Sequence, residues 1–287
     1  MIIGPLRALS CAFVLLVAGV VGAQTPATPT PAAATGKRNE WPTLKDTDKE
    51  RVLSLTGQFR KADPQLHQDA KTQLVALGEG AAPLLMQQVS DRAENSNPHL
   101  FAVLDELLKP QHAALIAREV KKPRIELRRY LVRRLCRMGD ADMAGVLEPL
   151  QKDKDEQTAF FAQLGLLALK RREPLPAVML YTKAHWAEVG PLIAEVLAPA
   201  RSNEVASWVF ESITKASATD QMTGLRLLRY LMVKEQGVIL RTYLEASEHS
   251  VKREAINTAR VLHGEAPIEN LSVFQAIDHA KQWLSKI

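Results

Sequence analysis

The densest group of chemically active side chains in this sequence is basic and lies in residues 118–137. Nine basic residues there stand against Glu119 and Glu126, a local charge of +7. If the segment is helical, a spacing of four places three arginines on one polar face: Arg129, Arg133 and Arg137. Clustered guanidinium groups attract anions, so the row predicts binding of an acidic protein, an anionic polymer or a lipid surface. The alternative is a solvated outer helix face.

Patterns for catalysis or metal binding are absent from the sequence. It has no paired-histidine helix, no Gly-x-Ser-x-Gly elbow, no glycine-rich phosphate loop and no cysteine cluster. Its two cysteines are Cys11 and Cys136. Cys136 follows Leu135 on an apolar helix side, which favours a small buried side chain over a reactive thiol. We expect no catalytic activity, no cofactor, no metal and no nucleic-acid partner.

A second candidate surface is apolar. Intervals that are multiples of 31 residues bring Met86, Met179 and Phe210 into one column, beside two columns of core residues. If these side chains are exposed, they form a groove for a protein partner. Packing between neighbouring repeats is the alternative.

Both surfaces depend on an internal period of 31 residues. One fully apolar column with this period is Leu85, Ile116, Leu147, Val178, Val209 and Leu240. A second, independent column is Leu104, Leu135, Leu166, Leu197, Leu228 and Ala259. The positions four residues before and three residues after each member of the second column are also mostly apolar, and this spacing is that of one helix face. Each repeat should therefore hold two antiparallel helices, of about 14 and 11 residues.

The predicted fold class is therefore all-α. Stacked helix pairs of this length form an α-solenoid, which we expect over residues 46–287. The segments 46–61 and 271–287 break the column pattern, and we expect them to be the N-terminal and C-terminal capping helices.

Two segments carry a resemblance to a known repeat family. Residues 127–153 contain Leu127-Arg128 and the turn Gly139-Asp140, and residues 251–264 repeat the opening as Val251-Lys252-Arg253 in the same register. Over roughly residues 64–264 the chain resembles HEAT-repeat proteins, and its short period is similar to that of the phycobilisome lyase class. The resemblance implies a HEAT- or armadillo-like superhelix and a structural role for Arg128 between repeats. It brings no active-site motif.

The N-terminus predicts export. Arg7 precedes an apolar run over residues 8–22, and Val21-Gly22-Ala23 has the small residues of a signal-peptidase site, so we expect a signal peptide over residues 1–23, cleaved after Ala23. An uncleaved membrane anchor is the alternative. Residues 24–45, rich in proline, threonine and alanine, are predicted to be a disordered linker.

Stacked repeats build a surface more often than a catalytic pocket. The sequence thus predicts a noncatalytic protein-interaction scaffold or adaptor that is periplasmic, in the cell envelope, or secreted. Its expected partner is another protein, which would be acidic if it binds the arginine row. Two alternatives stay open: an enzyme similar to bilin lyases, and a membrane-tethered envelope component that binds anionic lipid or polymer.

Overall fold

The computed structural model describes residues 39–93 and 95–287, and within them it has fourteen α-helices, short 3-10 turns and no strand. The all-α prediction is confirmed for this part of the chain. The first seven α-helices are α1 (Asp46–Gln58), α2 (Pro64–Ala76), α3 (Ala82–Gln88), α4 (Asn97–Leu107), α5 (Ala113–Glu119), α6 (Ile125–Met138) and α7 (Ala144–Leu150). The other seven are α8 (Glu156–Ala168), α9 (Leu175–Leu197), α10 (Asn203–Ile213), α11 (Ala218–Leu231), α12 (Arg241–Leu244), α13 (His249–Leu262) and α14 (Val273–Leu284).

Several helix ends are fixed by local sequence. α2 begins after Asp63, whose carboxylate accepts a hydrogen bond from the backbone N–H of Gln65 at 2.9 Å. α14 begins after Ser272, whose hydroxyl accepts one from the backbone N–H of Gln275 at 3.3 Å. α6 ends where Gly139 adopts a left-handed conformation with φ of 63°.

The period of 31 residues is visible in the secondary structure. A 3-10 turn leads into a seven-residue helix at three places with this spacing, at residues 79–88, 110–119 and 141–150. These second helices are shorter than the sequence predicts, because the first turn of each segment is 3-10. Both predicted core columns are buried, and no member is more than 1% exposed.

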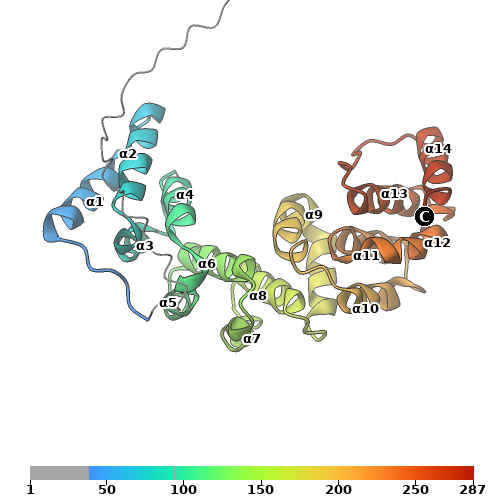
Figure 1. Ribbon diagram of the computed structural model, residues 1–287, viewed down its shortest axis with the longest axis horizontal. Coiled ribbons are helices and arrows are strands. Elements are labelled where there is room, and N and C mark those ends of the chain that lie inside the picture. Colours follow the sequence, from blue (N-terminus) through green and yellow to red (C-terminus); the bar gives the residue numbers. More distant parts are fainter. Residues whose placement is uncertain (1–38, 94) are drawn as a thin grey trace, which may run out of the picture. The chain divides into compact units, whose positions relative to one another are not determined.

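Neighbouring elements pack in sequence order. α5, α7, α10 and α12 each contact the longer helix that follows, namely α6, α8, α11 and α13. The longer helices also contact one another, α6 with α8, α9 with α11, and α11 with α13; Figure 1 shows α11 lying between α10 and α13. The two buried columns therefore face each other across successive helices and form a continuous apolar core.

Cys136 belongs to this core. It is a free cysteine, 6% exposed, and its Sγ lies 3.1 Å from the carbonyl oxygen of Phe161. A Cβ on Gly165 would lie 2.4 Å from that sulfur, so α6 and α8 approach closely at this point. Burial raises the pKa of the Cys136 thiol to about 12, which favours the structural role over a reactive thiolate.

The last residues of the predicted linker contact the helices. Trp41 lies against the His112 ring at 5.2 Å between centroids, and Arg118 Nη1 donates to the carbonyl oxygen of Asn39 at 3.1 Å. Residues 39–45 therefore pack on the helices, because Trp41 and Leu44 are apolar and join the core. The predicted signal peptide, its cleavage after Ala23 and the linker up to residue 38 lie outside the described residues.

Two further elements differ in detail from the expectation. α9 joins the second helix of one repeat to the first helix of the next, with the change of direction confined to His185 (φ −123°, ψ 24°). The closing helix α14 buries Trp283 and leaves Phe274 82% exposed, so its apolar residues are divided between the core and solvent.

Candidate binding surfaces

The predicted arginine row lies on α6, but its charges are paired. Arg129 pairs with Glu126 at 2.8 Å, and its Nε donates to Asp155 Oδ2 at 2.9 Å. Arg133 and Arg137 both pair with Glu195, at 3.2 and 3.4 Å. Glu126 is on α6 itself, but Glu195 is on α9 and Asp155 is in the segment before α8, so the row joins neighbouring helices. Free basic surface for an anionic partner is thereby reduced.

Other arginines of the basic segment act within the fold. Arg124 Nη1 donates to three carbonyl oxygens at the end of α3, those of Met86 and Gln87 at 2.8 Å and that of Val89 at 3.0 Å. Arg134 Nη2 donates to the carbonyl oxygens of Asp105 and Leu108 at 2.9 and 2.6 Å. Such bonds satisfy backbone acceptors that helix ends leave without an internal partner.

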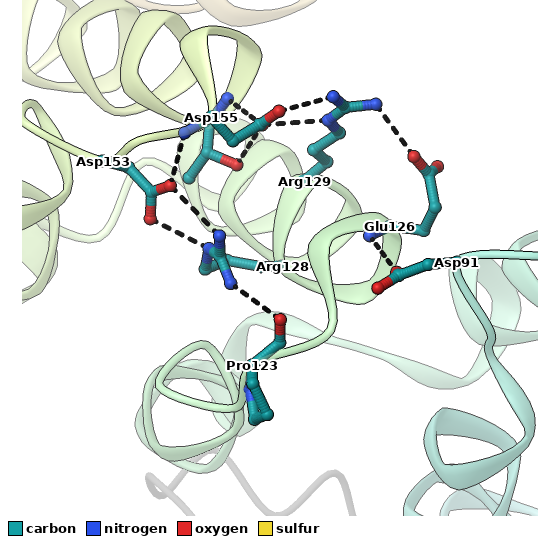
Figure 2. Close-up of polar contacts among 8 residues, drawn as sticks. Asp91, Pro123, Glu126, Arg128, Arg129, Asp153 and Asp155 are labelled. Carbon is teal, nitrogen blue, oxygen red and sulfur yellow. Dashed lines mark hydrogen bonds and ion pairs between the residues drawn. The ribbon is translucent and has the colours of Figure 1, made fainter.

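Arg128 connects the loops that precede α6 and α8. Its Nε lies 2.9 Å from Asp153 Oδ2, and its Nη1 donates to the carbonyl oxygen of Pro123 at 3.4 Å (Figure 2). Asp153 also accepts a hydrogen bond from the backbone N–H of Asp155 at 2.9 Å. One arginine thus holds the loop before α6 and the loop before α8.

Asp155 combines helix capping with ion pairing. Its carboxylate caps α8 by accepting from the backbone N–H and the hydroxyl of Thr158, at 2.9 and 2.7 Å, while Arg129 binds it from α6 (Figure 2). The hydrogen bond from Arg129, helped by those from Thr158, holds the pKa of Asp155 well below its usual range, although burial acts in the opposite direction.

This depressed pKa predicts a pH-dependent stability. A carboxylate whose pKa is lower in the folded than in the unfolded protein stabilises the fold above its unfolded pKa, about 3.9, and loses that contribution as the pH falls through the folded value. In Asp155→Asn the cap is kept and the charge is lost, so the variant should be less stable than wild type near neutral pH. Thermal unfolding should show this difference shrinking below about pH 4. A difference of equal size at pH 7 and at low pH would contradict the ion-pair role.

The apolar column divides into buried and half-buried members. Met86 is 0% exposed and belongs to the apolar core, so it does not contribute to a surface groove. Phe210 is half-buried and packs edge-on against Tyr243 at 6.3 Å between ring centroids. For these two residues the structure favours packing between repeats.

Met179 lines a groove of about 660 Å³ formed by α9, α10 and the start of α11. Its lining combines four apolar side chains with Trp208 from α10: Leu175, Pro176, Met179 and Ala216. The polar lining is Arg172, Glu173, Glu211, Ser212 and Asp220. Leu180, the residue after Met179, is 71% exposed and is not part of the lining.

Charges around this groove are partly paired with one another. Arg172 Nη2 donates to Glu211 Oε2 at 2.7 Å and its guanidinium lies 6.0 Å from the centre of the Trp208 ring. Lys183 Nζ donates to Asp220 Oδ1 at 2.8 Å. Among the lining side chains one arginine stands against three carboxylates, so the groove is weakly acidic.

A second concave site, which the sequence interpretation missed, lies between α9, α11 and α13. Arg226, Arg229 and Arg253 surround the buried carboxylate of Glu254 beside the ring of Trp186. The helical spacing of Arg226 and Arg229 could have indicated a basic pair. Only the packing of α13 on α11 brings Arg253 and Glu254 to them.

Comparisons with known proteins define no family for this chain. No family model matches it, and no curated protein matches it. Among solved structures it is similar to human deoxyhypusine hydroxylase in complex with glycerol, at 14% identity and a TM-score of 0.33, over 83% of this chain and 96% of that chain. In the described residues no helix is long and apolar enough to cross a membrane, and no group of three or more potential ligands could hold a metal ion.

Proposed function

We propose that this protein is an exported, noncatalytic interaction scaffold of the α-solenoid type, and that the groove lined by Met179 and Trp208 binds a segment of a partner protein. The observation that supports this best is the groove itself, in which apolar side chains of α9 lie beside Trp208 of α10. Tryptophan and methionine are enriched in the central part of protein interfaces.

The solenoid part of the proposal is supported by periodic packing. Both apolar columns recur every 31 residues and are buried throughout, and each long helix from α6 to α13 contacts a neighbouring repeat. Such stacking leaves one row of helices available to partners along its length. Export is supported by the apolar run at residues 8–22 and by Val21-Gly22-Ala23.

The lining charges indicate which partner segment fits. Since Arg172 pairs with Glu211 and Lys183 with Asp220, Glu173 is the surplus charge of the lining, and we infer a segment with apolar residues flanked by lysine or arginine. This differs from the acidic partner expected from the α6 row, whose arginines already pair with carboxylates of the protein. The alternatives of an anionic lipid or polymer partner depended on that row. No observation favours the bilin-lyase alternative.

The proposed function predicts that the binding of one partner protein depends on Met179. In Met179→Glu a negative charge enters an apolar, weakly acidic groove, so capture of the partner from the envelope should fall at least tenfold, about 1.4 kcal/mol of binding free energy. Leu53→Glu is the matched control, because Leu53 lies on α1 and is 49% exposed. Both variants should keep the helical circular dichroism of wild type.

The captured partner must be identified before the result can test the proposal. Its binding segment should carry basic residues, and its binding should weaken as salt is raised, because exposed charges are screened over about 10 Å at 0.1 M. Equal capture by wild type, Met179→Glu and Leu53→Glu would show that the groove is not the binding site.

A further inference from the structure

The pocket between α9, α11 and α13 has the chemistry of an anion site. It encloses about 520 Å³, within the range of small-molecule sites, and has Trp186 on one side and Tyr230 on another. The Arg226 and Arg229 guanidinium carbons lie 4.8 and 5.5 Å from the centre of the Trp186 ring. Cations at this distance are attracted by the face of an indole ring, so Trp186 helps to hold the two arginines in place.

The guanidinium groups of the three arginines have more N–H donors than the Glu254 carboxylate can accept. Each guanidinium carries five N–H donors, whereas the Glu254 carboxylate offers about four lone-pair sites. Arg229 Nη2 donates to Glu254 at 2.6 Å and Arg226 Nε at 3.3 Å. The nearest nitrogen of Arg253 lies 3.7 Å from Glu254, beyond hydrogen-bond distance. Arg229 is 5% exposed, and its Nε has no hydrogen-bond partner among the residues that the structure describes.

One rim of the pocket is also fixed in place. Asn257 of α13 donates from Nδ2 to the carbonyl oxygen of Ile268 at 3.0 Å and accepts from the Ile268 N–H at 2.8 Å. This pair of bonds holds the loop that contributes Pro267 and Glu269 to the lining. The pocket is therefore bounded by anchored backbone as well as by helices.

The charge count indicates a singly charged ligand. Three arginines stand against Glu254 and Glu269 among the lining residues, a surplus of one positive charge. Burial lowers the pKa of Arg226, and repulsion from Arg229 and Arg253 adds to this effect, while Glu254 opposes it. A bound monoanion would relieve that repulsion.

We propose that this pocket binds an organic carboxylate, with the carboxylate on Arg253 and Arg229 and an apolar or aromatic group against Trp186. A planar carboxylate matches the fork of guanidinium donors. The carboxylate can come from a free organic acid or from the C-terminus of a protein. This site is separate in its residues from the proposed partner groove and does not depend on it.

Calorimetric titration of the purified protein tests the proposal. The probes are phenylacetate, its neutral analogue phenylacetamide, inorganic phosphate, and a short peptide ending in phenylalanine with either a free or an amidated C-terminus. Phenylacetate or the free-acid peptide should bind at least about tenfold more tightly than its neutral counterpart, because the charge-assisted hydrogen bonds are lost with the charge. The tighter of the two acids identifies the source of the carboxylate.

Two variants test whether the acid binds in this pocket. Arg253→Gln should weaken binding of the acid about tenfold. It should leave the fold intact, because the Arg253 side chain is 30% exposed and makes only the longest contact to Glu254. Lys252→Gln removes the same charge from the same helix and should change nothing. The proposal is overturned by equal affinity for acid and amide, by tighter binding of phosphate, by equal loss in both variants, or by no binding of either acid.

Discussion

Replacement of Glu254 with alanine should lower the free energy of unfolding by about 3–5 kcal/mol, because a buried ion pair is broken while its partners stay buried. Glu254 is 4% exposed and pairs with Arg226 and Arg229 between α11 and α13. Without its carboxylate, the guanidiniums repel one another in a site with little access to water. Chemical denaturation of wild type and variant measures the difference.

Glu211→Ala is the matched control for that prediction. Glu211 also pairs with an arginine, Arg172, but both side chains are 58% exposed. Exposed ion pairs contribute about 0–1 kcal/mol, so this variant should unfold close to wild type. Similar losses in Glu254→Ala and Glu211→Ala would show that burial of the Glu254 cluster does not determine its contribution.

Replacement of Leu135 with alanine should cost about 2–5 kcal/mol in the free energy of unfolding, through lost apolar burial and the cavity left behind. Leu135 is 1% exposed in the column that runs through the long helices. Leu180→Ala removes the same atoms from a side chain that is 71% exposed and should change the unfolding free energy by less than about 0.5 kcal/mol. If both variants melt at the same temperature, the assigned helix register is wrong.

The helices and their buried faces could be predicted from the sequence because apolar side chains recur with the helical period. Leu104, Leu135 and Leu166 occupy one register and are all buried. The period also predicts that Val178 and Leu197 lie on separate helices, but not that the two helices are joined within α9 by a kink at the single residue His185. The length of each 3-10 turn also depends on packing against neighbouring repeats, which the sequence of one repeat does not show.

The binding surfaces were harder to predict because partners of charged side chains lie far away in sequence. Arg129 meets Asp155 over 26 residues and Arg133 meets Glu195 over 62, so a charge count in residues 118–137 overstates the free positive charge. Similarly, Met86 and Met179 occupy the same column, but Met86 is buried in the core whereas Met179 lines a groove. Column position alone does not distinguish core from surface.

Site-specific photo-crosslinking in the native envelope tests the proposed scaffold function most directly. A photoreactive amino acid in place of Met179 should link the protein to one identified partner, through a peptide that contains apolar residues beside lysine or arginine. The same group in place of Leu53 should not give this product. An identical set of products from both positions, or none from position 179, would contradict the proposal that this groove binds a partner protein.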